Sequence, residues 1–104
     1  MARKFILTQN GVIRLGEVRM HKDLLQPNDI CWGGGFYEFD YGSNLIILSG
    51  QSFDFGEPRW ERFFSRDITL KMPEEYRGMG IVYKYDDDIR QDVPITQDYT
   101  IEYI

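Results

Sequence analysis

Residues 31–50, CWGGGFYEFDYGSNLIILSG, place three consecutive glycines directly before two β-prone segments. Glycine loses more backbone freedom on folding than any other residue, so three together are costly in an ordered chain. Residues 36–50 are rich in aromatic and branched side chains and are interrupted at 42–44 by Gly-Ser-Asn, which predicts a pair of strands joined by a short loop. The simplest role for the glycines is a sharp turn into this strand pair. A phosphate-binding loop is the alternative, because glycine N–H groups can crowd around an anion.

Further strands are predicted on both sides of this stretch. An Asn10-Gly11 turn signal favours a hairpin between the first two, and the broken alternation at Gly16 predicts a bulge. Residues 22–29 have room for one helical turn at most. In the last segment, Pro94 confines at least the start of the strand to a sheet edge. The β-prone segments are residues 3–9, 12–21, 80–86 and 93–104.

Residues 57–70 are the best candidate for a helix. Aromatic and aliphatic residues recur there at helical spacing, and a proline stands near each end. With the strands, this helix predicts an α/β fold: a single domain over residues 1–104, with a mixed sheet of about five or six strands and one main helix. The residues that set the helical spacing are Trp60, Phe63, Phe64 and Ile68.

The charge of the chain limits its ligands. The net charge is −5, yet residues 1–22 hold five basic side chains and one acidic, a local balance of +4. An acidic chain is a poor candidate for general nucleic-acid binding, whereas its basic N-terminal part could serve a small anion. The absence of an apolar run long enough to span a bilayer predicts no membrane partner. One cysteine, Cys31, cannot form an internal disulfide, so we expect a cytoplasmic protein.

The only histidine is the first candidate for chemistry. His21 ends a β-prone segment, where side chains can open onto a loop-lined site, and Arg19 and Lys22 would draw an anionic substrate to it. A structural role is the alternative and is common for a lone histidine. Ser52, a few residues before the predicted helix, could bind phosphate or simply form a turn. One histidine and one cysteine cannot build a common zinc site, and no P-loop is present, so no metal or cofactor is predicted.

Several segments together match one protein family. Residues 31–35 (CWGGG) are followed, after a predicted strand pair, by residues 50–56 (GQSFDFG), while residues 20–24 read MHKDL and residues 4–7 read KFIL. This arrangement resembles the phosphohistidine phosphatase family, also called the Janus/Ocnus family. Animal members carry Cys-Leu-Gly-Gly-Gly, a strand pair and then Gly-Tyr-Ser-Met-Ala-Tyr-Gly, with a catalytic histidine in Tyr-His-Ala-Asp-Ile and a phosphate-binding lysine in Lys-Tyr-Val-Leu.

The resemblance implies a metal-free phosphohydrolase that removes phosphate from phosphohistidine. His21 would be the catalytic residue, either activating water or attacking phosphorus itself. Lys4 would bind the phosphoryl oxygens. The glycines would lead into a central strand near the site without holding phosphate. Further substrate-binding residues implied by the resemblance are Lys22, Ser52, Phe53 and Asp54.

Three departures from the family pattern keep other functions open, and one of them is that the tail after residue 88 has no counterpart in the family. The segment from His21 to Gly33 is shorter than in the animal proteins, and Asp54 replaces a small alanine, where a carboxylate would repel an anion. A non-catalytic module that recognises a phosphorylated or acidic partner is therefore an alternative, as is a protein-interaction domain using its Tyr and Phe side chains. The enzyme's partner would be a phosphorylated protein or a small phosphoramidate. The oligomeric state is left open.

Overall fold

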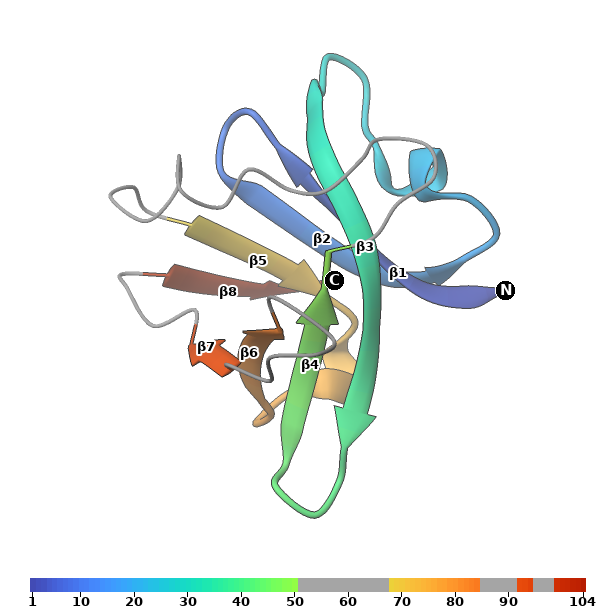
Figure 1. Cartoon of the computed structure of the whole chain (residues 1–104). Helices are drawn as coiled ribbons and strands as arrows, with labels where there is room; N and C mark the ends of the chain where they lie inside the picture. The colour runs from blue at the N-terminus through green and yellow to red at the C-terminus, as the bar shows by residue number, and fades with distance from the viewer. Residues whose placement is uncertain (51–67, 85–91, 95–98) are drawn as a thin grey trace.

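The computed structural model describes residues 1–50, 68–84, 92–94 and 99–104. These residues form an eight-stranded mixed sheet in the order β7-β6-β4-β3-β1-β2-β5-β8 (Figure 1). Two short 3₁₀ helices, η1 (His21–Leu24) and η3 (Glu74–Tyr76), are the helical segments among the described residues. The strands are β1 (Ala2–Thr8), β2 (Val12–Val18), β3 (Cys31–Asp40), β4 (Leu45–Ser49), β5 (Ile68–Met72), β6 (Gly80–Lys84), β7 (Asp92–Pro94) and β8 (Tyr99–Tyr103).

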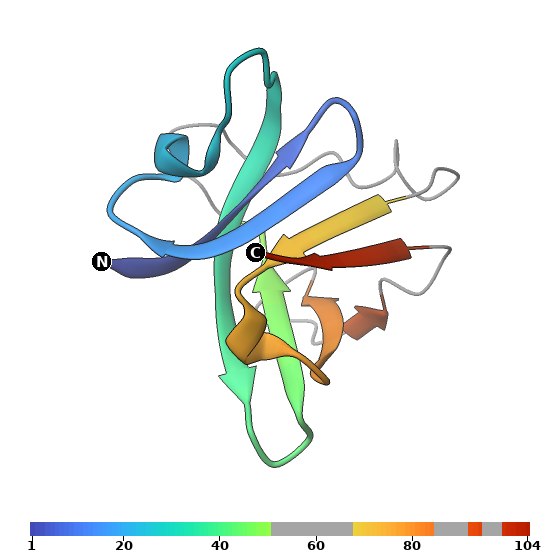
Figure 2. The same cartoon turned by 180° about the vertical axis from the view of Figure 1, so that it is seen from behind.

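Strand β3 joins the two halves of the sheet. It pairs with β1 along its first part and with β4 along its second, meeting both at Phe36. Strands β2, β5 and β8 continue beyond β1, and strands β6 and β7 continue beyond β4. The two opposite views show the sheet curling around β3, so that β5 and β8 face β4 and β6 (Figures 1 and 2). One face of the sheet is therefore enclosed and the other is turned outward.

Alternation along the first hairpin separates these two faces. The pairs Phe5–Leu15 and Leu7–Ile13 place apolar side chains on the enclosed face, where each is almost fully buried. The positions that alternate with these pairs lie on what we call the outer face, the side of β1, β2 and β3 that carries Lys4, Ile6, Arg14, Gly16, Gly34 and Phe36. The enclosed core also takes Tyr37, Ile46, Leu48, Ile68, Leu70, Met72, Tyr76, Ile81 and Tyr83.

The predicted α/β fold with one main helix is wrong. Most of the described residues lie in strands, their helical segments are two short 3₁₀ helices, and the sheet has more strands than the five or six expected. Of the predicted helix 57–70, residues 68–70 begin strand β5, and residues 57–67 lie outside the described residues. The reason is visible in β5 itself. Ile68, Leu70 and Met72 are buried and alternate with more exposed Thr69 and Lys71, which is the period of a strand.

The glycine triplet lies inside β3, not in a turn before it. Residues 33–35 are buried and pair with β1. The register shifts at the start of this pairing: Leu7 faces Gly33, while Thr8 faces Cys31, which leaves an extra residue in β3. Gly33 has a φ of 138°, a backbone conformation that L side chains rarely adopt. The first glycine thus permits a bulge in the long central strand.

The bulge predicted at Gly16 is also wrong, because β1 and β2 pair without a register shift from Ala2–Val18 to Leu7–Ile13. Both predicted hairpins are confirmed, β1–β2 and β3–β4. Pro94 lies in β7, an edge strand, as expected, but the single strand predicted over residues 93–104 is wrong, because β7 and β8 are separate strands at opposite edges of the sheet. None of the helical segments that the structure describes has the length and apolar character needed to cross a membrane.

Candidate functional site

His21 lies at the start of a 3₁₀ helix, not at the end of a strand. Strand β2 stops at Val18, and η1 begins three residues later. The turn is closed by Asp23, whose side chain accepts a hydrogen bond from the Met20 N–H at 3.0 Å and whose own N–H donates to the Met20 carbonyl at 3.0 Å. Helix η1 packs on β1 and β2. This packing places His21 on the outer face of the sheet with only 2% of its surface exposed.

Two glycines make room for η1 on the sheet. A Cβ atom on Gly34 would stand 3.1 Å from the His21 Cδ2 atom and 2.8 Å from the Phe5 carbonyl oxygen. On the same face, but in β2 at the other edge of β1, a Cβ on Gly16 would stand 3.0 Å from a methyl group of Leu24. His21 and Leu24 are the two ends of η1. The missing side chains therefore let the whole turn lie directly against the strands.

The hydrogen bond of the His21 ring defines which nitrogen can act as a base. The Nε2 atom lies 2.8 Å from the carbonyl oxygen of Gly35. A carbonyl oxygen only accepts hydrogen bonds, so Nε2 carries the proton and donates it. In the neutral ring the basic lone pair is then on Nδ1. The third glycine of the triplet thus sets the tautomer of the histidine.

The Phe36 ring contacts both Lys4 and His21 on the outer face. Lys4 and Phe36 are paired across β1 and β3, and the Lys4 ammonium lies 5.8 Å from the centre of the Phe36 ring. The His21 ring meets Phe36 nearly perpendicularly, with 5.3 Å between the ring centres. Lys4 Nζ also donates to the carbonyl of Arg19 at 2.6 Å, in the link between β2 and η1. We call Lys4, Arg19, His21, Lys22 and Phe36 the outer-face cluster.

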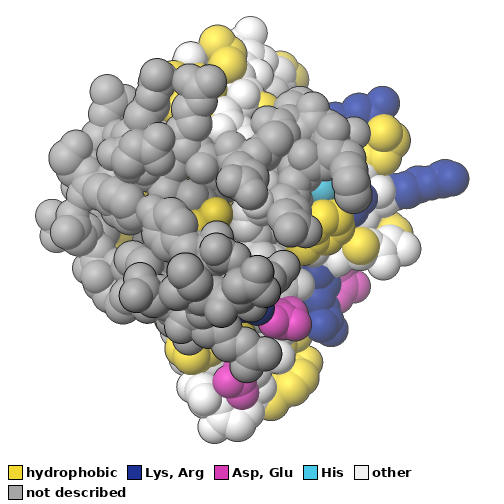
Figure 3. All heavy atoms as spheres, viewed as in Figure 1, with side chains coloured by type: hydrophobic (Ala, Val, Ile, Leu, Met, Phe, Trp, Pro, Cys, Tyr) yellow, Lys and Arg dark blue, Asp and Glu magenta, His cyan; other side chains and the backbone are white. Residues whose placement is uncertain are grey.

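The outer-face cluster has a positive surface. The side chains of Arg19 and Lys22 are exposed and that of Lys4 is half-buried, while the exposed Asp23 is the nearby acidic residue on η1. Figure 3 shows Lys and Arg side chains on the side of the molecule where the histidine lies. The predicted site residues Lys4, His21 and Lys22 are therefore on one face. Ser52, Phe53 and Asp54 lie outside the described residues.

Sequence reasoning did not find Phe36, whose contacts join the two predicted functional side chains. An aromatic residue in a strand carries no sign of its own that it will meet a histidine from another segment. The cross-strand pairing of a lysine with an aromatic is the available signal, and it needs the register of β1 against β3.

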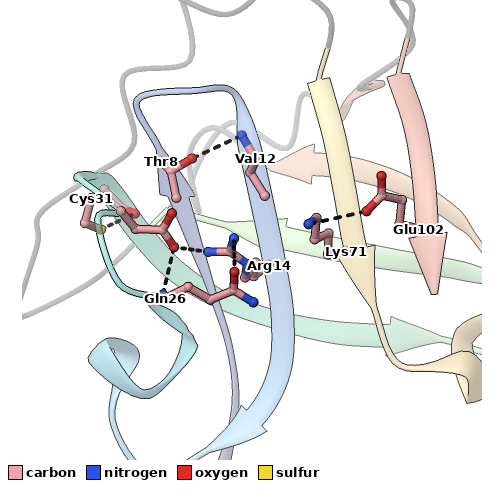
Figure 4. Close-up of polar contacts among 9 residues, drawn as sticks. Thr8, Val12, Arg14, Gln26, Cys31, Lys71 and Glu102 are labelled. Carbon is pink, nitrogen blue, oxygen red and sulfur yellow. Dashed lines mark hydrogen bonds and ion pairs between the residues drawn. The ribbon is translucent and has the colours of Figure 1, made fainter. Parts of the chain in front are cut away.

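A buried ion pair anchors the segment that links η1 to β3. The Arg14 guanidinium on β2 donates to the Asp29 carboxylate and, at 3.3 Å, to the Gln26 side-chain oxygen (Figure 4). The same carboxylate accepts the Gln26 N–H at 2.8 Å. Burial alone would raise the pKa of Asp29, but the Gln26 N–H and the Arg14 charge outweigh it, so the pKa is lowered. This pair holds the segment that follows the His21 turn on the sheet.

No protein-family model, no curated protein and no solved structure matches this chain. Its function is therefore inferred from its own residues.

Proposed function

We propose that the outer-face cluster binds a phosphoryl group and hydrolyses phosphohistidine, as the resemblance to the phosphohistidine phosphatase family implies. The observation that supports the proposal best is the shared contact of Lys4 and His21 with Phe36. A cation for the phosphoryl oxygens and a base for the reaction come together on one surface, from segments that are separate in the sequence. An ammonium group has three N–H donors, so the bond from Lys4 to the Arg19 carbonyl leaves it able to bind an anion.

The reaction uses the lone pair on His21 Nδ1. As water attacks phosphorus, this nitrogen takes its proton, the phosphorus–nitrogen bond of the substrate breaks, and the proton passes to the leaving imidazole nitrogen. Inorganic phosphate and unmodified histidine are the products. Direct attack of Nδ1 on phosphorus, followed by hydrolysis of the phosphorylated His21, gives the same products. In both routes the Gly35 carbonyl holds the ring through Nε2.

The surroundings of the cluster support a small, doubly charged anion as ligand. Lys4, Arg19 and Lys22 supply three cations in a chain whose net charge is −5, so the positive field is local. A phosphorylated protein or a small phosphoramidate in the cytoplasm would meet this requirement. An extended nucleic-acid backbone would not.

Recognition without hydrolysis is the second candidate, and one observation favours it. Only 2% of the His21 surface is exposed, which fits a residue that organises the surface for binding. In this case Lys4, Arg19 and Lys22 hold the phosphoryl group and His21 supports η1 beneath them.

The decisive experiment combines binding with turnover. We expect a phosphohistidine peptide to be hydrolysed by the wild-type chain, and His21→Ala to lose about a hundredfold or more in rate. His21→Gln is the matched control, since its amide can still donate to the Gly35 carbonyl but cannot act as a base. Equal loss in both variants, with phosphate binding kept, supports catalysis. Phosphate binding without any wild-type turnover supports recognition, and absence of binding rejects both functions.

A further inference from the structure

Phe36 occupies a special place on β3. On the outer face its ring is in contact with His21 and lies under the ammonium group of Lys4. Phe39, three residues further along β3, makes a similar cation contact on the side that faces the core. The centre of its ring lies 4.4 Å from the guanidinium carbon of Arg3. Adjacent cations of β1 therefore cover two phenylalanines of β3. The first of these rings also contacts the imidazole of His21.

We infer that Phe36 is a positioning residue, which holds the Lys4 ammonium and the His21 imidazole in one fixed arrangement. The inference rests on the proposed function for its meaning in catalysis, but its structural part is independent of any substrate. Phe36 itself takes up no proton and forms no bond with phosphorus. It acts through the two side chains that it touches.

The physical basis is the shape and charge distribution of the aromatic ring. A perpendicular contact between rings is favoured by their quadrupoles, and it restricts rotation of the imidazole about its side-chain bonds. A cation within about 6 Å of the ring centre is attracted to the ring face. Because one ring makes both contacts, a change at position 36 affects the base and the cation together. An aliphatic side chain of similar size would keep the burial but lose both preferences.

The arrangement also fixes the direction of the His21 ring. Gly34 lies beneath the imidazole, the Gly35 carbonyl accepts a hydrogen bond from its Nε2–H, and Phe36 stands beside it. Three successive residues of β3 thus each restrain a different part of the ring. Phe36 already carries a side chain, so it can be replaced without adding one to the crowded glycine positions, which makes it the suitable position for a test.

The experiment compares Phe36→Leu with Phe39→Leu. Both remove a phenylalanine of β3 that lies under a cation, so Phe39→Leu controls for loss of an aromatic side chain and of a cation contact. In ¹⁵N-labelled protein without substrate, we expect neutral His21 to show a single form protonated at Nε2 in the wild type and in Phe39→Leu. Phe36→Leu should show mixed forms, and Phe36→Tyr should restore the single form.

The functional part of the test uses phosphohistidine hydrolysis. We expect Phe36→Leu to lose roughly tenfold in kcat/KM, the size of one aromatic contact expressed as a rate. Combining it with Lys4→Ala should cost less than the sum of the two single effects, because both act on the same arrangement. Thermal unfolding of each variant shows whether the comparison is made on folded protein.

The outcomes separate this inference from the proposed function. An unchanged His21 tautomer in Phe36→Leu, or an equal change in Phe39→Leu, overturns the positioning role even if the chain hydrolyses phosphohistidine. A disturbed tautomer in Phe36→Leu alone, restored by Phe36→Tyr, supports the positioning role even if the chain has no hydrolase activity.

Discussion

The imidazole of His21 lies so close to Gly34 that a single methyl group on Gly34 would stand 3.1 Å from the ring and 2.8 Å from a backbone oxygen of β1. The second contact is shorter than real Cβ atoms show, and its partner is backbone, which cannot move aside without shifting the strand. The fold therefore requires glycine at this position of β3, because η1 and β1 take the space that a side chain would need.

Gly34→Ala is expected to lower the free energy of unfolding by about 1–3 kcal/mol, the range for overpacked positions. Gly16→Ala is the matched control: its Cβ would meet the end of the Leu24 side chain, which can rotate away, so we expect a change of less than about 1 kcal/mol. Urea unfolding of the two variants measures the difference. Equal effects would contradict the requirement for glycine at position 34.

Replacing Asp29 should change how stability depends on pH. Its pKa is lowered in the folded chain, so it stabilises the fold above its ordinary pKa of 3.8, and this contribution is lost as the pH falls through the lower folded value. Asp29→Asn keeps hydrogen-bonding capacity but removes the charge facing Arg14. We expect it to be less stable than the wild type at neutral pH and to lose less stability on acidification. Parallel unfolding curves at neutral and acid pH would contradict this.

The loss in Asp29→Ala should be larger, about 3 kcal/mol, because the buried Arg14 guanidinium then has no carboxylate opposite it. Arg3–Glu17 offers a comparison on the same hairpin. That pair is well exposed, with side-chain exposures of 42% and 56%, so Glu17→Ala is expected to cost less than about 1 kcal/mol. Denaturant unfolding of the two variants under the same conditions tests the contrast.

A tyrosine pair in the enclosed core gives a prediction at high pH. The hydroxyl groups of Tyr37 and Tyr76 lie 2.6 Å apart, and both residues are buried. Burial, and then the hydrogen bond to Tyr76, raise the pKa of Tyr37 above its ordinary value of 10. The stability that this gives is present below that value and is lost as the pH rises beyond it. Tyr37→Phe should therefore lose less stability than the wild type when the pH is raised from neutral to alkaline.

Tyr76→Phe tests the same pair from the other side. It leaves the Tyr37 hydroxyl buried without this partner, and we expect a cost of about 1–3 kcal/mol. The absorbance of ionised tyrosine, followed against pH beside circular dichroism, shows whether Tyr37 ionises only as the chain unfolds. Ionisation of Tyr37 well before unfolding would contradict the role of burial.

The parts of the fold that could be predicted are those set by neighbours in the sequence. The β1–β2 and β3–β4 hairpins follow from local alternation and short turns. The helix predicted at 57–70 is wrong over residues 68–70. The segment has large apolar residues at helical spacing, but Ile68, Leu70 and Met72 also alternate with the period of a strand. Local patterns compete in such a segment, and pairing with β2 and β8 decides in favour of a strand.

The candidate site could be predicted only in part, for a related reason. Lys4 and His21 were predicted from the sequence by charge, by residue type and by resemblance, and the structure places both beside Phe36. Their common neighbour Phe36 was not, because its contacts depend on the register of β1 against β3 and on the packing of η1. Glycine triplets have many roles, and the structure shows three separate ones: a bulge at Gly33, a close contact at Gly34 and a hydrogen-bond acceptor at Gly35.

The last prediction concerns Lys4 and its neighbour Arg3, which project to opposite faces of β1. Titration with inorganic phosphate should shift amide signals of Arg19, His21 and Lys22, since these residues belong to the outer-face cluster, in which the Lys4 ammonium donates to the Arg19 carbonyl. Lys4→Ala should weaken phosphate binding roughly tenfold, as expected when one charge-assisted contact to an anion is lost. Arg3→Ala removes one positive charge from the preceding residue. The Arg3 side chain lies by Phe39 and Glu17, away from the outer-face cluster.

The comparison of these two variants distinguishes a site from a general attraction. If phosphate is held by the cluster, Arg3→Ala binds it almost as the wild type does, and the difference from Lys4→Ala persists when salt is raised to physiological ionic strength. A diffuse positive field would be weakened similarly by either substitution and would be largely screened by that salt. Equal losses in the two variants would therefore reject the outer-face cluster as a phosphoryl site, and with it both functions proposed for this chain.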